Sequence, residues 1–146
     1  MRLVKFLPLF VFLLLPILIF PIELTVRAEM ENLNITSLGG GIRSFNSFLG
    51  VDLSVLKDLT NGFYMKGSLF LAIPAGDLIP YGGLTKEFNL SNLSNIFDFS
   101  TDLYGTIGLE IKMSNLGLFG EASYNLNSPI TVINPSKISF GISFEF

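Results

Sequence analysis

Cysteine and histidine are both absent from this 146-residue chain. No disulfide framework can form without cysteine, and the two missing residues are the most useful ligands for transition metals. Their absence also removes the commonest general base and the best nucleophile of enzymes. We therefore expect no catalytic activity, no metal and no other cofactor.

Basic residues are few: 9 Lys and Arg stand against 12 Asp and Glu, which gives a formal net charge of −3. Proteins that bind nucleic acid need a clustered basic face to neutralise phosphates. We therefore expect no nucleic-acid partner.

The N-terminus has the arrangement of a secretory signal. A basic start precedes the apolar residues 6–22, and Val26-Arg27-Ala28 ends the segment on a small residue. We predict a signal peptide over residues 1–28, cleaved after Ala28, which leaves residues 29–146 as one domain.

A retained membrane anchor is the alternative for this segment. Its apolar run of about 17 residues is at the short limit for a spanning helix. Pro8, Pro16 and Pro21 interrupt the run, and a proline inside a helix costs about 3 kcal/mol. Both features favour cleavage over retention.

After residue 28, apolar residues alternate with polar or small ones in stretches of about ten. A period of two is that of a β-strand, and no stretch reaches the roughly 18 apolar residues of a membrane-spanning helix. Seven strands can be recognised in this way, over residues 34–45, 48–56, 62–73, 78–88, 102–113, 116–126 and 137–146.

Single-chain bacterial barrels have an even number of strands, so an eighth strand is expected. We place it in residues 29–38, with Gly39-Gly40-Gly41 acting as a turn, or in residues 89–99; otherwise the chain is a truncated or divergent copy. Short connections alternate with longer ones, as in a barrel with tight periplasmic turns and longer outer loops. The expected outer loops are residues 57–61, 89–101 and 127–135.

The chain ends in a strand, Ile138–Phe146, with one wholly apolar face. In a soluble protein such a strand would cover a core. In a transmembrane barrel it is the closing strand, apolar toward lipid and polar toward the lumen. The apolar face runs to a bare terminal aromatic through Phe140, Ile142, Phe144 and Phe146.

The mid-strand charges share the face opposite the aliphatic one; they are Asp52, Lys66, Glu110, Lys112 and Glu121. In a soluble sandwich this face would meet water, whereas in a small barrel it points into the lumen, where charges must pair. Alternation suits both folds, but the export signal and the aromatic closing strand favour the barrel. The predicted fold class is all-β, an up-and-down antiparallel transmembrane β-barrel of eight short strands.

Residues Gly105–Lys112 and Gly117–Tyr124, with the closing strand, resemble small outer-membrane β-barrels of the OmpA/OmpX-like porin family type. Such families typically have a glutamate and a tyrosine in the penultimate strand, matched here by Glu121 and Tyr124. The resemblance implies that Phe146 and the alternate apolar positions before it are the signal read by the outer-membrane assembly machinery. It also implies contact with outer-membrane lipid in a Gram-negative-type bacterium.

Glu110 and Glu121 flank the Ser114-Asn115 turn and are candidates for a carboxylate pair. We expect Lys66 or Lys112 to neutralise them in a structural network, because buried ionic groups are normally retained as pairs. A catalytic role for the two glutamates is the weaker hypothesis.

Inward aromatic side chains should fill the lumen further, since a barrel of about eight strands is just wide enough for side chains. They are Tyr64, Phe70, Tyr104 and Phe119. We therefore predict no wide aqueous channel.

The sequence thus predicts a small outer-membrane barrel with a structural or surface-interaction role, whose outer loops carry any binding. The alternative is a soluble periplasmic β-sandwich or β-barrel that binds a small apolar or lipid ligand. The ligand and the oligomeric state do not follow from the sequence.

Overall fold

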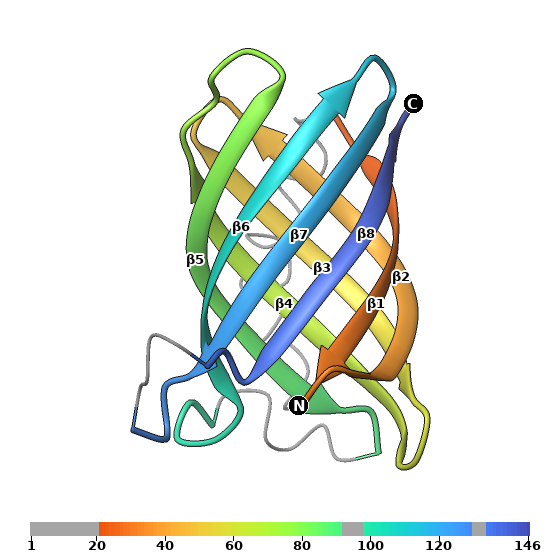
Figure 1. Ribbon diagram of the computed structural model, residues 1–146, viewed down its shortest axis with the longest axis vertical. Coiled ribbons are helices and arrows are strands. Elements are labelled where there is room, and N and C mark those ends of the chain that lie inside the picture. The colour runs from red at the N-terminus through yellow and green to blue at the C-terminus, as the bar shows by residue number, and fades with distance from the viewer. Residues whose placement is uncertain (1–20, 92–97, 130–133) are drawn as a thin grey trace, which may run out of the picture.

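The computed structural model describes residues 21–91, 98–129 and 134–146. Over these residues, eight antiparallel strands pair in chain order and close into one barrel through the pairing of β1 with β8 (Figure 1). The strands are β1 (Glu23–Glu31), β2 (Asn34–Asn46), β3 (Leu49–Asp58), β4 (Gly62–Ala72), β5 (Leu78–Asn89), β6 (Leu103–Met113), β7 (Leu116–Asn125) and β8 (Lys137–Glu145). The expected eight-stranded up-and-down barrel is confirmed. Among the described residues, no helix is long and apolar enough to cross a membrane.

The eighth strand lies at the start of the barrel, and neither of the two positions expected from the sequence is right. It is β1, which turns into β2 at Asn32 and Leu33 with φ angles of 49° and 64°. Two positive φ angles are what a two-residue hairpin of the primed type requires. The glycine run is in the middle of β2, while Asn89 is the last residue of β5 and residues 90–91 follow it.

The surroundings of Gly39 show why the glycine run forms part of a strand in the barrel wall and does not form a turn. A Cβ atom on Gly39 would lie 2.2 Å from the carbonyl oxygen of Val55 on β3. The missing side chains let β2 approach its neighbour closely at this point.

The barrel therefore begins at Glu23, and the boundary expected after Ala28 falls inside β1. A chain that started at residue 29 would keep only the last part of this nine-residue strand. The expected domain, residues 29–146, is shorter than the barrel in the structure.

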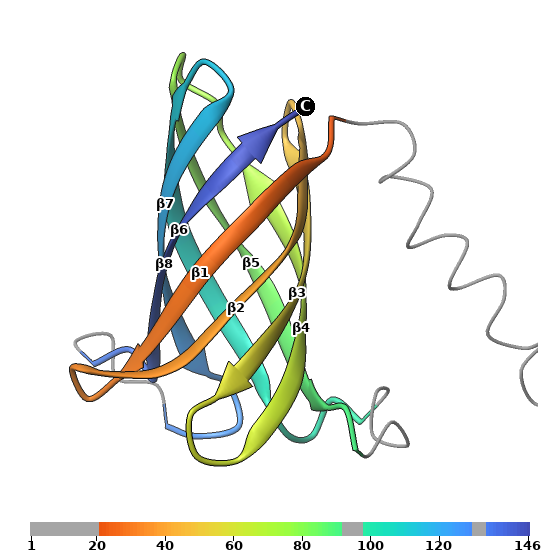
Figure 2. The ribbon, with the colours of Figure 1, turned by 90° about the vertical axis from the view of Figure 1, so that its right-hand side faces the viewer.

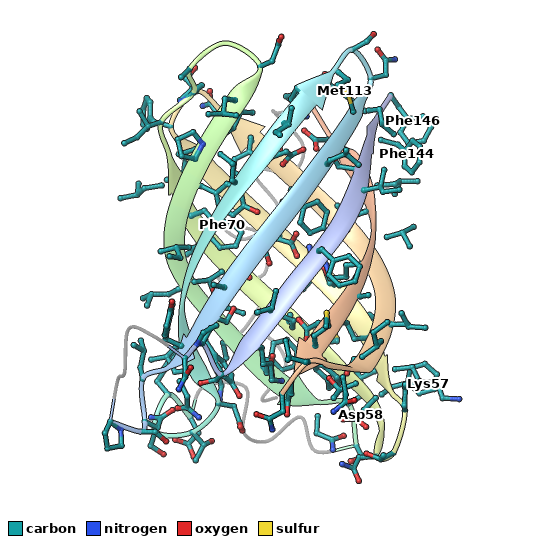
Figure 3. The ribbon with its side chains drawn as sticks, viewed as in Figure 1. Lys57, Asp58, Phe70, Met113, Phe144 and Phe146 are labelled. Carbon is teal, nitrogen blue, oxygen red and sulfur yellow. The ribbon has the colours of Figure 1, made fainter. Side chains whose placement is uncertain are left out.

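The two faces of the wall have inverted polarity. Among the described residues, charged side chains such as Arg43, Lys66 and Glu110 are at most 1% exposed. Figure 3 shows Phe70 inside the barrel, while Phe144 and Phe146 project outward. Large apolar side chains on the outside of the strands include Leu24, Val26, Leu38, Val55, Leu69, Leu71, Leu84, Ile107, Leu109, Ile111, Leu118, Ile138, Phe140, Ile142 and Phe144.

The two ends of the barrel differ in their connections. What we call the turn end carries the chain's C-terminus, the start of β1 and the connections 47–48, 73–77 and 114–115 (Figures 1 and 2). The loop end carries the connections 32–33, 59–61, 90–102 and 126–136. The described residues of all three segments expected to be outer loops therefore lie at the loop end.

Candidate functional site

The centre of the lumen holds a cluster of two arginines and three carboxylates, which we call the central cluster. Its members are Arg27 on β1, Arg43 on β2, Asp52 on β3, Glu110 on β6 and Glu121 on β7. Arg43 Nε donates to Asp52 Oδ2 at 2.8 Å, and its Nη1 lies 3.3 Å from Glu110 Oε2. Arg43 also pairs with Glu121. The guanidinium of Arg43 on β2 therefore contacts carboxylates from three other strands, β3, β6 and β7.

Arg27 completes the cluster from the neighbouring strand. It pairs with Asp52, and its Nη1 lies 3.5 Å from Glu121 Oε2. Both arginine side chains are no more than 1% exposed. Because a buried charge without a partner is strongly unfavourable, Asp52 and Glu121 depend on both guanidinium groups and Glu110 depends on that of Arg43.

Aromatic rings surround the central cluster. The Tyr81 hydroxyl accepts a hydrogen bond from Arg43 Nη1 at 3.0 Å and donates one to Glu121 at 2.8 Å. The guanidinium of Arg43 lies 4.0 Å from the ring centroid of Phe119 and 5.9 Å from that of Phe70. Contacts of this kind between a cation and an aromatic face are favourable, more so when water is excluded.

The lumen has room for these rings because each is paired directly across the strands with a glycine. The pairs are Phe45–Gly50, Phe70–Gly83, Tyr81–Gly108 and Phe119–Gly141. A Cβ atom on Gly108 would lie 2.5 Å from the Tyr81 ring, and one on Gly141 would lie 2.5 Å from the Phe119 ring. The inward glycines therefore fix where the rings lie.

A second group of charges, the loop-end cluster, lies toward the long connections. Lys66 pairs with Glu29, and the Tyr64 hydroxyl donates to Glu29 Oε2 at 2.6 Å. Lys137 Nζ lies 2.6 Å from Glu87 and 3.5 Å from Glu31.

Two tyrosines and the second oxygen of Glu87 complete the loop-end cluster. The amino group of Lys137 lies 5.2 Å from the ring centroid of Tyr64 and 5.4 Å from that of Tyr104. The buried Oε1 of Glu87 has no hydrogen-bond partner but lies 3.9 Å from Lys66 Nζ. Lys137, the first residue of β8, therefore contacts side chains from β1, β4, β5 and β6.

The third group is at the turn end, around Lys112. Its amino group pairs with Glu23 and lies 3.5 Å from Glu145 and 3.7 Å from Glu110. Glu23 and Glu145 are also direct cross-strand neighbours of β1 and β8. Lys112 therefore holds the seam where the barrel closes.

Between the charged groups, a row of hydroxyls crosses four strands. Ser68, Thr85, Thr106 and Ser123 form a continuous chain in which each oxygen lies 2.9 Å from the next. Together with the clusters and rings, this row occupies the interior with side chains, as expected for a barrel of this size.

The structure brings all five charges predicted from the sequence into the lumen, but with different partners. Asp52, Glu110 and Glu121 belong to the central cluster, Lys112 to the turn end and Lys66 to the loop-end cluster. Lys112 approaches Glu110 as expected, whereas Lys66 pairs with Glu29 and reaches neither predicted glutamate.

The groups that sequence reasoning missed are chiefly the two arginines. Arg27 lay within the predicted signal peptide, and Arg43 lay in a strand whose alternation the glycines weaken. Counting alternate positions back from Phe45 would have placed Arg43 on the same face as Gly41 and Gly39. Glu110 and Glu121 both pair with its guanidinium.

The aliphatic and aromatic positions of the closing strand are outside. Phe140, Ile142 and Phe144 are between 38% and 44% exposed, and Phe146 follows the end of β8. This strand pairs with β7 on one side and β1 on the other. Its role as an assembly signal stays a prediction.

The loop-end connections have local polar contacts of their own. Asp58 accepts hydrogen bonds from the backbone N–H groups of Thr60 and Asn61 at 2.7 and 3.0 Å. Ser100 donates to Asp98 through its hydroxyl and backbone N–H, which lowers the pKa of that carboxyl below its ordinary value. Parts of the two expected long loops, residues 92–97 and 130–133, lie outside the described residues.

In the described part of the chain, no group of acidic side chains is arranged to hold a metal ion. No family model, curated protein or solved structure matches this chain. The resemblance to OmpA/OmpX-like barrels therefore stays a prediction from the residues that carry it.

Proposed function

We propose that this chain is a small outer-membrane β-barrel protein with a structural or surface-interaction role. The observation that carries the proposal is the inverted polarity of the wall. Charged side chains line the inside, while side chains such as Leu71, Ile107 and Phe140 are between 44% and 66% exposed on the outside. A barrel in lipid needs an apolar band on the outside and has a polar interior.

The strand closure supports the same proposal. In lipid, every backbone polar group of the wall must find its partner within the protein, and only helices and closed barrels meet this need. Here β1 and β8 pair over eight residues of β1, from Glu23 to Met30, so the sheet has no free edge.

The alternative of a soluble ligand-binding protein has less support. A β-sandwich is excluded because the strands form one closed barrel. A soluble barrel that holds an apolar ligand needs an apolar lumen, whereas this lumen contains the central cluster and the hydroxyl row.

The proposed role is at the surface, with no wide pore. Side chains that meet across the lumen, such as Arg43 with Phe119, leave little space for water. The loop end, with connections 59–61, 90–102 and 126–136, would face the outside of the cell and contact partners. Export through the N-terminal apolar segment and delivery by the barrel assembly machinery through β8 belong to the same proposal.

Membrane fractionation combined with gel mobility tests the location. The protein should be recovered with the outer membrane, and unboiled samples should migrate differently from boiled ones because the closed barrel resists detergent. Recovery as a soluble monomer with no heat-dependent mobility would reject the proposal. Ion conductance of porin size from the purified protein in planar bilayers would reject the filled lumen.

A further inference from the structure

The pairing of strand β1 argues against the cleavage after Ala28 that the sequence pattern predicts. We infer that the mature barrel keeps Glu23–Ala28, and that Val26-Arg27-Ala28 is part of the barrel wall and not a cleavage site. The inference rests on the proposed function, because it takes the wall to be in contact with lipid.

The backbone of these six residues closes the barrel. Glu23–Ala28 pairs with residues 38–43 of β2 on one side and with residues 140–145 of β8 on the other. Without them, only Glu29 and Met30 would remain paired with β8. The edges of β2 and β8 would then be open within the lipid, where unpaired backbone groups are not tolerated.

The side chains of the same residues hold the lumen together. Loss of Arg27 would leave one guanidinium, that of Arg43, among the three carboxylates of the central cluster. Loss of Glu23 would remove the closest partner of Lys112 at the turn end. Since a buried charge requires a partner, cleavage after Ala28 would disrupt two clusters at once.

The small residue that suggested cleavage has a role in the wall. Ala28 lies on the outer face, directly across from Leu38 on β2 and Phe140 on β8. Its neighbour Arg27 points into the lumen and is 2% exposed. Leu24 and Val26 are exposed while Thr25, Arg27 and Glu29 are buried, which is the alternation of a barrel strand, and Ala28 continues the outward positions with 8% exposure.

The residues before β1 contain no other signal-peptide cleavage site of the kind that needs small residues. Residues 1–22 contain no alanine, glycine, serine or threonine. Cleavage of a secretory signal requires small residues at its end. Residues 1–22 therefore offer no alternative cleavage site of this type, and the mature barrel is expected to include Glu23–Ala28.

Intact-mass measurement on the heat-modifiable protein from outer membranes tests the inference. The expected N-terminus is at or before Glu23. An N-terminus at any position from Leu24 to Glu29 would overturn the inference. Fractionation and heat-dependent mobility are read from the same sample, so a failure of the proposed location is separately visible.

Two pairs of chains sharpen this test, the first being the natural chain and its Ala28→Leu variant. Ala28→Leu removes the small residue but keeps an apolar side chain on the outer face, and it should change neither the mass nor the mobility. A longer product from this variant than from the natural chain would show cleavage after Ala28 and overturn the inference. In the second pair, a leader with a defined cut site replaces either residues 1–22 or residues 1–28. The first chain should form the heat-modifiable barrel and the second should not; equal folding of both would contradict the inference.

Discussion

The guanidinium of Arg43 on β2 lies 4.0 Å from the ring centroid of Phe119 on β7. The two strands are not neighbours in the sheet, so the contact crosses the lumen. Arg43 also reaches carboxylates of β3, β6 and β7 and the hydroxyl of Tyr81 on β5. The wall is thus held by strand pairing, and Arg43 is one of the buried side chains that join its opposite sides.

Replacement of Arg43 should therefore destabilise the barrel more than replacement of any exposed cation. Arg43→Met leaves Asp52 and Glu121 with Arg27 as their cationic partner, and leaves Glu110 with Lys112 at 3.7 Å. Removal of one member of a buried ion pair typically costs about 3–5 kcal/mol. Urea unfolding of the refolded barrel in detergent or lipid, followed by gel mobility, measures the change.

Lys57→Met is the matched control for this variant. Lys57 is exposed on the outside of β3, so its loss should change the unfolding free energy by less than about 1 kcal/mol. Equal unfolding curves for the two variants would show that the central cluster contributes nothing to stability.

The strands were predictable because the period of two is a local property of the chain. The expected ranges for the last seven strands lie within one or two residues of β2–β8. The sequence did not predict β1, although Leu24, Val26 and Ala28 alternate with inward polar residues. The reason is that the same residues also fit the end of a signal peptide. The apolar run before them favoured that interpretation.

The partners within the lumen could not be predicted in the same way. The charge positions followed from alternation, but which charges meet across the barrel depends on how far each strand is shifted relative to the next. Lys66 lies at the height of Glu29 on β1, and Arg43 lies at the height of Glu121. That shift is a property of the closed sheet and not of any single segment.

Phe119→Ala should be strongly destabilising, whereas Phe140→Ala should not. Phe119 is 4% exposed and packs against Arg27 and Arg43, while Phe140 is 44% exposed on the outer face. A buried Phe→Ala change typically costs about 3–5 kcal/mol. The comparison uses the same unfolding measurement. If Phe140→Ala were the more damaging change, the inside and outside of the wall would be reversed.

Gly141→Ala should disrupt packing where Gly120→Ala should be tolerated. A Cβ atom on Gly141 would lie 2.3 Å from the carbonyl oxygen of Val26 and 2.5 Å from the Phe119 ring. At Gly120 no atom lies within 4 Å of such a Cβ. Overpacking typically costs about 1–3 kcal/mol, so the unfolding midpoint should fall for Gly141→Ala alone. An equal fall for both would mean that the lumen does not fix the position of this ring.

A lysine on the outer face separates a barrel in lipid from one in water. Ile107 is 58% exposed near the middle of β6, and Leu103 lies at the loop end of the same strand. In lipid, a lysine at the bilayer midplane costs about 2–4 kcal/mol, and near the interface about 0–1 kcal/mol. Ile107→Lys should therefore reduce refolding into lipid vesicles, while Leu103→Lys should not. In water, an exposed lysine at either site would leave folding unchanged, because no hydrocarbon would be there to exclude the charge. A normal yield of folded Ile107→Lys in vesicles would therefore contradict a lipid-facing outer surface.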